Sequence, residues 1–323
     1  MNTAEHTFQH SSVLLNETVR YLVEKAPAAG VFADGTLGGG GHAAKICAFL
    51  NDSGLLIGID RDIEAIRAAE SRLQNYECGR LLVHDNYKKI KDILEKYCID
   101  SLDGALLDLG VSSFQLDTPD RGFSYMCESP LDMRMNRQEG ELSAEYVVNH
   151  YSRDDLTRIL TVYGEERWAS RISSFIEKRR KLKPICSSSE LVEIIREAIP
   201  ASARREGPHP AKRTFQAIRI EVNDELGILE SSLDDWIDCL NPGARLCVIT
   251  FHSLEDRIVK ETFKRRENPC TCPKTIPLCV CGKKADGKRV VKKPIVSGAE
   301  ELERNPRARS AKLRVFERGV FAV

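Results

Sequence analysis

The chain has 323 residues, of which 42% are hydrophobic and 30% charged, so it is long enough for about two globular domains. Its 48 basic and 48 acidic residues cancel, which excludes a strongly basic global field and leaves only local patches for contact with nucleic acid. No apolar run approaches the roughly 20 residues that span a membrane, and 11 cysteines without an export signal indicate a reducing compartment, so we expect a cytoplasmic protein without a membrane partner.

The first 110 residues alternate between strand and helix patterns. Strands are predicted at 31–34, 55–60, 80–84 and 104–109. Helices are predicted between them, at 43–50, 63–74 and 87–97. Such regular alternation predicts a parallel sheet with helices on both faces.

The alternation breaks after the fourth strand and resumes about 100 residues later. Helical periodicity alone follows the break, with N-cap signals at Ser143 and Ser187. Those helices are expected at 144–151, 154–163, 165–180 and 189–198. After the break an amphipathic stretch at 217–240 ends at Pro242-Gly243. A strand at 245–251, a helix at 254–265 and a last strand at 313–317 are predicted to follow.

We therefore predict an α/β chain with a Rossmann-like, doubly wound, mostly parallel sheet and an inserted all-helical domain. The sheet domain comprises 1–113 and 214–323, the second segment with a basic C-terminal region, and the helical insertion comprises 114–213.

Four consecutive glycines, Gly38 to Gly41, follow the first strand and precede a helix pattern. The second strand ends in Asp60, 19 residues after Gly41. This spacing is typical of folds that hydrogen-bond the ribose hydroxyls of a nucleoside cofactor. Asp34 opens the loop and would repel the pyrophosphate of NAD but attract an ammonium group, which favours S-adenosylmethionine.

Acids also end the first and fourth strands, as Asp34 and Asp108. Ligands of open α/β sheets bind at the carboxyl edge, so Asp34, Asp60 and Asp108 are expected to converge on one crevice, although each alone could cap the next turn. Tyr87 follows the third strand and either stacks on adenine or fills the core.

The segment Phe251–Arg257 places several polar groups at the end of a later strand. His252 is a candidate acid or base. The competing interpretation is a helix cap, with Ser253 as N-cap and Asp256 as the reciprocal N3 acid; both can hold together.

Two further features allow alternatives. The array Cys270, Cys272, Cys279 and Cys281 offers four thiolates, but its C-x-C spacing is not the usual C-x-x-C, so zinc stays open and no metal is assigned. Basic patches are either solvated surface or contacts for RNA. They lie at 178–183, 283–293 and 304–314.

Taken together, the motifs run through the whole chain and resemble those of the bacterial small-subunit ribosomal RNA cytosine-N4 methyltransferases, the RsmH or MraW family. Mild departures are Ser12, Ser129, Asn136 and Tyr87, where Pro, Gly, Asp and Phe are common. The matching runs are 10–17, 34–42, 107–113, 115–117, 121–124, 130–135, 163–166, 209–211, 214–217, 222–226, 251–260 and 305–310.

The resemblance implies a methyltransferase domain interrupted by a helical RNA-recognition domain, with S-adenosylmethionine as cofactor and small-subunit ribosomal RNA or a ribosomal particle as partner. The implied cofactor residues are Gly40, Gly41, His42, Asp60, Tyr87, Asp108 and Gln115.

For the chemistry, Asp108 is the first candidate to act on the cytosine amine, and His252 and Asp256 are second. Two alternatives are kept, an NAD-dependent oxidoreductase that uses the same glycines and a non-catalytic RNA-binding factor for ribosome assembly. The modified nucleotide, the choice between naked RNA and an assembled particle, and the oligomeric state stay open.

Overall fold

The computed structural model describes residues 12–138, 140, 142–205, 207, 209–273 and 280–319. The chain forms two compact units. One, the sheet unit, comprises Met1–Gly110 and Ile228–Val323, and the other, the helical unit, comprises Val111–Gly227. We describe each unit by itself.

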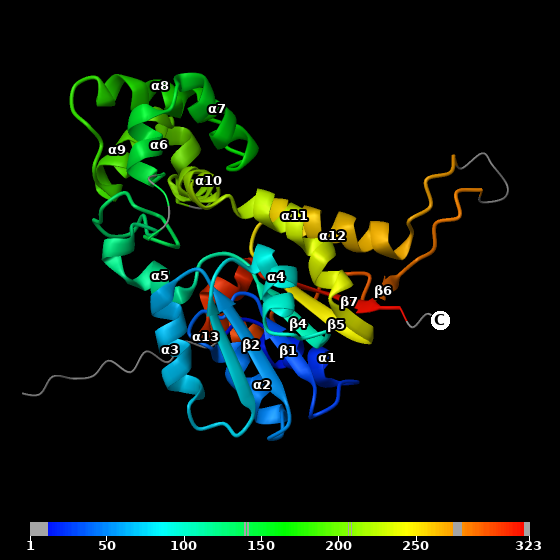
Figure 1. Ribbon diagram of the computed structural model, residues 1–323. Coiled ribbons are helices and arrows are strands. Elements are labelled where there is room, and N and C mark those ends of the chain that lie inside the picture. Colours follow the sequence, from blue (N-terminus) through cyan, green and yellow to red (C-terminus); the bar gives the residue numbers. More distant parts are fainter. Residues whose placement is uncertain are drawn as a thin grey trace, which may run out of the picture. The chain divides into compact units, whose positions relative to one another are not determined.

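The sheet unit contains a seven-stranded sheet with the order β3-β2-β1-β4-β5-β7-β6 among the described residues (Figure 1). Its strands are β1 (Val31–Asp34), β2 (Leu55–Asp60), β3 (Gly79–His84), β4 (Leu102–Asp108), β5 (Leu240–Thr250), β6 (Gly287–Arg289) and β7 (Lys312–Arg318). Neighbours from β3 to β5 pair in parallel, whereas β7 is antiparallel to β5 and β6. The predicted Rossmann-like, mostly parallel sheet is confirmed.

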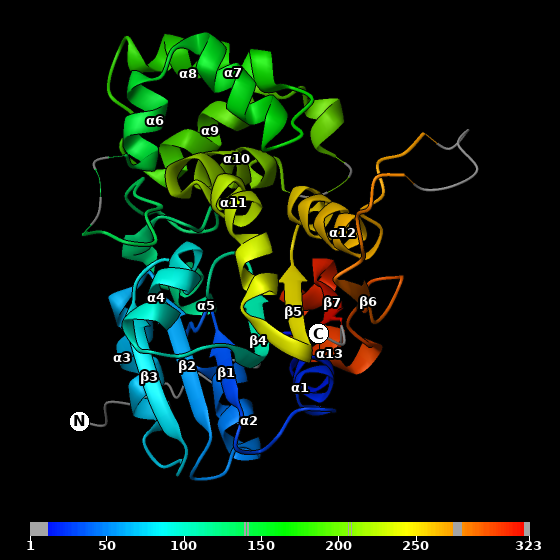
Figure 2. The same ribbon diagram turned by 45° about the vertical axis from the view of Figure 1, so that its right-hand side comes forward.

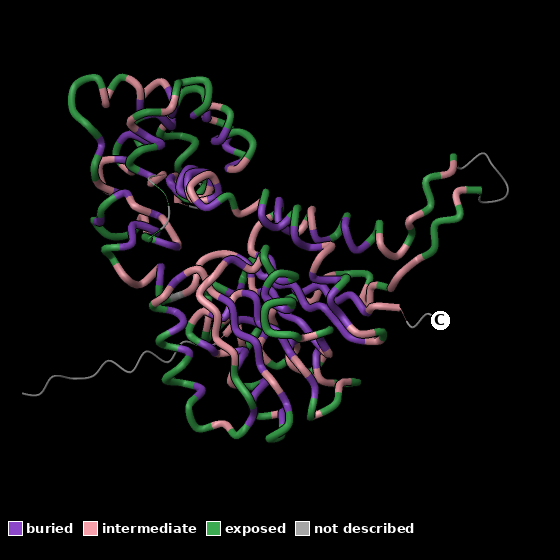
Figure 3. Tube along the Cα trace, viewed as in Figure 1, coloured by how far each residue is buried: buried purple, intermediate pink, exposed green. Residues whose placement is uncertain are grey.

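Helices cover both faces of this sheet. The helices that share a core with one face are α1 (Leu15–Val23), α2 (Gly41–Phe49), α3 (Ile63–Leu73) and α13 (Ala299–Arg304). Those on the other face are α4 (Ile90–Lys96), α11 (Glu225–Asp238) and α12 (Ser253–Glu267). Short 3₁₀ turns are η1 (Tyr87–Lys89) and η4 (Pro306–Ser310). Because both faces are covered, the strands are near-continuous apolar runs, and Figure 3 shows buried residues following them.

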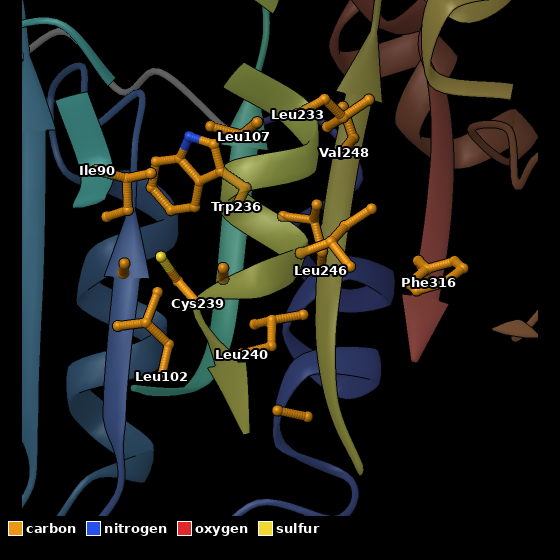
Figure 4. Packing of buried hydrophobic residues seen from close by; sticks show 14 of the residues in the cluster. Ile90, Leu102, Leu107, Leu233, Trp236, Cys239, Leu240, Leu246, Val248 and Phe316 are labelled. Carbon is orange, nitrogen blue, oxygen red and sulfur yellow. The ribbon is translucent and has the colours of Figure 1, made fainter. Parts of the chain in front are cut away.

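Trp236 of α11 is the largest fully buried side chain on the second face. Figure 4 shows its ring between Ile90 of α4 and Leu107 of β4. Its indole Nε1 donates to the carbonyl oxygen of Tyr87 at 3.1 Å, so the polar atom of the ring is satisfied. A Cβ on Gly35 would lie 2.6 Å from both Trp236 and Leu107, which explains why glycine follows β1.

The helical unit has its own hydrophobic core. Its elements are α5 (Ser113–Asp117), η2 (Pro119–Arg121), α6 (Ala144–His150), α7 (Arg153–Val162), α8 (Ala169–Arg180), α9 (Ser188–Ala198), η3 (Ala201–Arg204) and α10 (Lys212–Asn223). Both predicted N-caps are present, since the backbone N–H of Tyr146 donates to Ser143 and that of Glu190 donates to Ser187.

The boundaries of the insertion differ from those predicted, because the helical unit runs from 111 to 227 rather than from 114 to 213. The larger difference is at the C-terminal boundary, which lies at 227 rather than at 213. Phe215 and Ile218 of α10 are buried in the core of the helical unit, so α10 belongs there. The amphipathic stretch 217–240 is two helices, because Asp224 takes a left-handed conformation (φ 48°) and ends α10.

Several local predictions were wrong or incomplete. Pro242 and Gly243 lie inside β5 rather than before it, and the pairing with β4 is irregular there, as proline offers no N–H to a ladder. Periodicity did not reveal the short α5 and α13, the three-residue β6, or α1 (Leu15–Val23).

Candidate cofactor and catalytic site

Three acids lie at the carboxyl edge of the sheet, where β1, β2 and β4 end in Asp34, Asp60 and Asp108. These strands are parallel neighbours in the order β2-β1-β4, so the three acids lie at one edge of the sheet, and a ligand crevice between them stays a prediction. Burial, opposed by hydrogen bonds from Thr36 and reinforced by the charge of Asp60, raises the pKa of Asp34 to about 7. The edge therefore gathers carboxyl groups whose ionised forms are poorly solvated, and a cationic ligand would stabilise those ionised forms.

Asp60 is fixed by backbone donors. Its Oδ2 accepts from the N–H of Gly38 and its Oδ1 from the N–H of Asp62, both at 2.8 Å. Burial raises its pKa to about 6. A carboxylate has about four lone-pair positions, so these bonds leave capacity for the hydroxyls of a ribose.

The glycine loop brings bare backbone to the same edge. Gly40 is the N-cap of α2 in a left-handed conformation (φ 73°), which glycine adopts without strain. A Cβ on Gly41 would lie 1.9 Å from Oγ of Ser12, whereas one on Gly39 would meet nothing within 4 Å. A side chain at Gly39 would therefore meet open space, whereas one at Gly41, beside the first N–H groups of α2, would displace the hydroxyl of Ser12.

His42 connects this helix to Asp108. Its Nε2 lies 3.1 Å from the carbonyl oxygen of Val13, and its Nδ1 lies 3.6 Å from Oδ2 of Asp108. Burial lowers the pKa of His42 to about 4, so the ring is neutral at pH 7. A carbonyl can only accept, so Nε2 carries the proton and Nδ1 presents a lone pair toward Asp108.

Asp108 has the least satisfied carboxylate of this edge. Its backbone N–H donates to Oγ1 of Thr36 at 2.5 Å, but its buried Oδ1 has no hydrogen-bond partner among the described residues. Burial, with the charges of Asp34 and Glu255, raises its pKa well above the usual range. A buried acceptor without a donor is costly, and an ammonium or amine donor on a ligand would satisfy it.

The segment Phe251–Arg257 begins α12, and its cap differs from that predicted. His252, not Ser253, is the N-cap, and Glu255 is the reciprocal acid. Oε2 of Glu255 accepts from the N–H of Phe251 and of His252, at 2.8 and 3.2 Å, while Nε2 of His252 lies 3.1 Å from Oε1 of Glu255. The prediction counted the capping positions one residue too far along.

Asp256 faces cations instead. Its Oδ1 accepts from Nε of Arg314 at 2.7 Å, and its Oδ2 lies 3.3 Å from Nζ of Lys312. Although burial opposes it, these partners hold the pKa of Asp256 below its usual range. Asp256 is therefore held as an ion pair that joins α12 to β7.

Two of the predicted cofactor residues, Tyr87 and Gln115, make contacts that do not involve the three strand-end acids. Tyr87 is half-buried and packs against the hydrophobic core that includes residues of α4 and α11. The structure thus gives its ring a packing role, and its contact with adenine stays a prediction. Gln115 belongs to the helical unit, where it is buried and forms a capping box with Ser112. Its role toward a cofactor stays a prediction.

Sequence reasoning assigned no role in the site to Thr36, Ser12 or Glu255. Thr36 accepts from Asp108 and donates its backbone N–H to Oδ1 of Asp34 at 3.1 Å, so it spaces two of the acids. Only its position inside the loop, two residues after Asp34, could have suggested this. Glu255 could have been found by counting three residues from His252.

A doubly wound sheet with a glycine loop after β1 and acids at the strand ends is typical of the class of enzymes that bind a nucleoside cofactor. The model of the family described as the MraW methylase family matches residues 7–319, and the chain belongs to that family. The protein is thus a methyltransferase that uses S-adenosylmethionine.

Curated relatives are similar along nearly the whole chain. A protein of Halothermothrix orenii named ribosomal RNA small subunit methyltransferase H is 54% identical, over 96% of this chain and 98% of its own length. Proteins of the same name are 55% identical in Acetivibrio thermocellus, over 96% and 99%, and 56% identical in Clostridium botulinum strain Kyoto, over 95% and 98%. Among the described residues, no helix is long and apolar enough to span a bilayer.

Proposed function

We propose that this protein methylates the exocyclic N4 amine of a cytosine in small-subunit ribosomal RNA. The observation that carries the proposal is the buried carboxylate edge, with the unsatisfied Oδ1 of Asp108, in a chain of the MraW methylase family. The names of its relatives supply the substrate class. Neither an oxidoreductase nor a non-catalytic assembly factor is supported by that family.

We assign the cofactor to this edge because its residues fit one. When bound, S-adenosylmethionine supplies a methyl group on a positively charged sulfur. Asp60 has lone pairs to hold ribose hydroxyls, and Gly40 and Gly41 leave room for the amino-acid end beside the start of α2. Asp108 and Asp34 offer the negative charge that the ammonium group requires.

The target amine is a poor nucleophile, because its nitrogen lone pair is delocalised into the pyrimidine ring. An acceptor for an amine N–H returns electron density to nitrogen and takes up the proton that leaves on methylation. Oδ1 of Asp108 is the acceptor that we place first. His252 comes second, and Asp256 comes after both, because its ion pairs with Arg314 and Lys312 make it a weak proton acceptor.

We assign RNA recognition to the helical unit, and α8 supports this. The guanidinium of Arg171 and the ammonium of Lys178 lie 5.5 and 5.7 Å from the centroid of Phe175, and both cations are exposed. An aromatic ring flanked by two cations is suited to stacked bases and phosphates. Elsewhere in the patch 178–183, Arg180 instead donates to the carbonyl oxygens of Val148 and Tyr151.

We also propose that the protein works in the cytoplasm, where bacterial ribosomal subunits are assembled. The direct test is mass mapping of methylcytidine in ribosomal RNA from cells with and without the gene. Purified protein and S-adenosylmethionine should restore the missing methyl group to RNA or particles from the deficient cells. A methylcytidine map that does not change on deletion of the gene refutes the proposal.

The RNA surface has its own test. Reversing Arg171 and Lys178 to Glu should weaken RNA binding and lower the slope of log affinity against log salt by about 0.7 for each phosphate that the variant no longer neutralises. Reversing the exposed Lys45 and Lys96 of the sheet unit is the matched control. An equal slope in both double variants removes α8 from the RNA-binding surface.

A further inference from the structure

The segment between α12 and β6 is not explained by methyl transfer. Figures 1 and 2 show it leaving the end of α12 and returning to β6 as two stretches that extend away from the sheet. None of its described residues, 268–273 and 280–286, is buried, and Val280 is 76% exposed. Apolar packing therefore does not hold the described part of this segment together.

Three cysteines meet in it. The Sγ atoms of Cys270, Cys272 and Cys281 all lie within 4.8 Å of one another, and none of the three is in a disulfide. Thiolates at Zn–S distances of about 2.3 Å in a tetrahedron have sulfur–sulfur separations of roughly 3.8 Å. The observed cluster is compact enough to close around one such ion.

The backbone near the cluster brings its two stretches together. The N–H of Val280, in the returning stretch, donates to Sγ of Cys272 in the outgoing one, at 3.4 Å. Gly282 follows Cys281 in a left-handed conformation (φ 66°), so the chain turns directly after the third sulfur. Soft thiolate sets select zinc over magnesium or calcium, which prefer oxygen ligands.

We propose that Cys270, Cys272 and Cys281 bind one zinc ion that crosslinks this segment. The fourth position of a tetrahedral ion is then left to water or to one further donor; Cys279, the other member of the sequence array, lies outside the described residues. The site is independent of the proposed methylation, because it uses none of the carboxylate edge.

Ion pairs fix the other end of the same segment. Nε of Arg266 lies 2.8 Å from Oδ2 of Asp286, and Nε of Arg289 donates to Oε2 of Glu267 at 2.7 Å. With these pairs at its base, a zinc ion further out would order the stretch that carries the exposed Lys283 and Lys284. The proposed role of the ion is therefore structural, in presenting this basic stretch.

The test measures metal in the full-length protein. Protein purified from zinc-containing medium without chelators or histidine tags should contain about one zinc ion per chain by mass spectrometry. Cys270→Ser, Cys272→Ser and Cys281→Ser should each lose it. Cys98→Ser and Cys186→Ser are matched controls, since both cysteines are exposed but lie outside the cluster, and they should keep it.

Cobalt provides a second readout. Co²⁺ added to metal-free protein should give a thiolate-to-cobalt charge-transfer band that is absent from the three cluster variants and displaced by Zn²⁺. The proposal is overturned by metal-free protein that binds neither ion, by zinc that survives all three substitutions, by bound iron in place of zinc, or by a disulfide among the three cysteines in reduced cytoplasmic extract. Binding of S-adenosylhomocysteine, measured on the same variants, should be unchanged, which separates this test from that of the methyltransferase site.

Discussion

Replacing Asp108 by Asn is the sharpest test of the carboxylate edge. The change keeps the shape of the side chain and the backbone N–H that bonds Thr36, but it removes the negative charge. It also puts either an amide oxygen or an NH₂ donor at the position of the unsatisfied Oδ1. Since Oδ2 is 3.6 Å from Nδ1 of His42, the new NH₂ can also turn toward that lone pair.

The expected loss of rate or of affinity depends on whether Asp108 binds the cytosine amine or the cofactor ammonium. If it accepts from the cytosine amine, loss of the acid–base group lowers the methylation rate at saturating cofactor by at least ~10²-fold. If it holds only the ammonium of the cofactor, the loss of a charge-assisted hydrogen bond costs about 1.5–3 kcal/mol, and affinity falls about tenfold to hundredfold while the saturated rate recovers.

Single-turnover methylation at saturating S-adenosylmethionine separates the two cases, with calorimetric titration of S-adenosylhomocysteine beside it. We expect near-normal affinity and a slow chemical step. A variant with full rate at saturation and normal affinity refutes both roles, and the proton acceptor is then sought at His252. Chemical denaturation serves as the folding control, because Oδ1 of Asp108 has no hydrogen bond within the described residues for the variant to lose.

Two further substitutions test the cofactor contacts. Asp60→Ala should weaken cofactor binding about tenfold to hundredfold, since it removes charged hydrogen bonds; unchanged calorimetric affinity in a folded variant would exclude the ribose assignment. Gly41→Ala should impair cofactor binding, because its methyl group would displace the Ser12 hydroxyl and cover the backbone at the start of α2, whereas Gly39→Ala should behave as wild type. Equal effects of both alanines would mean that open backbone at Gly41 is unimportant.

Much of the sheet could be predicted because its signals are local. The runs that became β1 and β2 are apolar and bounded by glycine or acid, and their predicted limits match the structure. The boundary of the insertion could not be placed as well, since α10 is amphipathic and either unit could bury its apolar face. Only the packing of Phe215 and Ile218 decides the question.

In the candidate site, the positions of the acids could be predicted from the sequence, but their hydrogen-bond partners could not. Strand-end acids could be found from the sequence, because parallel topology brings Asp34, Asp60 and Asp108 to one edge. Their hydrogen bonds could not, as the role of Thr36 depends on side-chain direction inside a loop. Neighbouring acids in α12 also have roles that the sequence does not distinguish. Glu255 caps the helix, whereas Asp256, one residue later, forms an ion pair with Arg314 of β7.

The raised pKa values lead to a prediction about pH. In the cofactor-free protein Asp34 and Asp60 hold protons below pH values of about 7 and about 6, and Asp108, whose pKa is raised well above its usual range, is a third carboxyl that burial keeps protonated. A cation bound beside them favours the ionised carboxylates, so binding must release protons, and affinity must rise with pH through about 6 and about 7, the pKa values of Asp60 and Asp34.

Calorimetric titrations of S-adenosylmethionine between pH 5 and pH 8, in buffers with different heats of ionisation, measure both the affinity and the number of protons released. Asp34→Asn should flatten the pH dependence while the amide oxygen keeps the bond from the N–H of Thr36. Methylthioadenosine, which lacks the ammonium group and the sulfonium charge, should show little dependence. If the affinity of S-adenosylmethionine is flat or falls as pH rises, the carboxylate edge does not act as a cation site, because ionised acids can only favour the charged ligand.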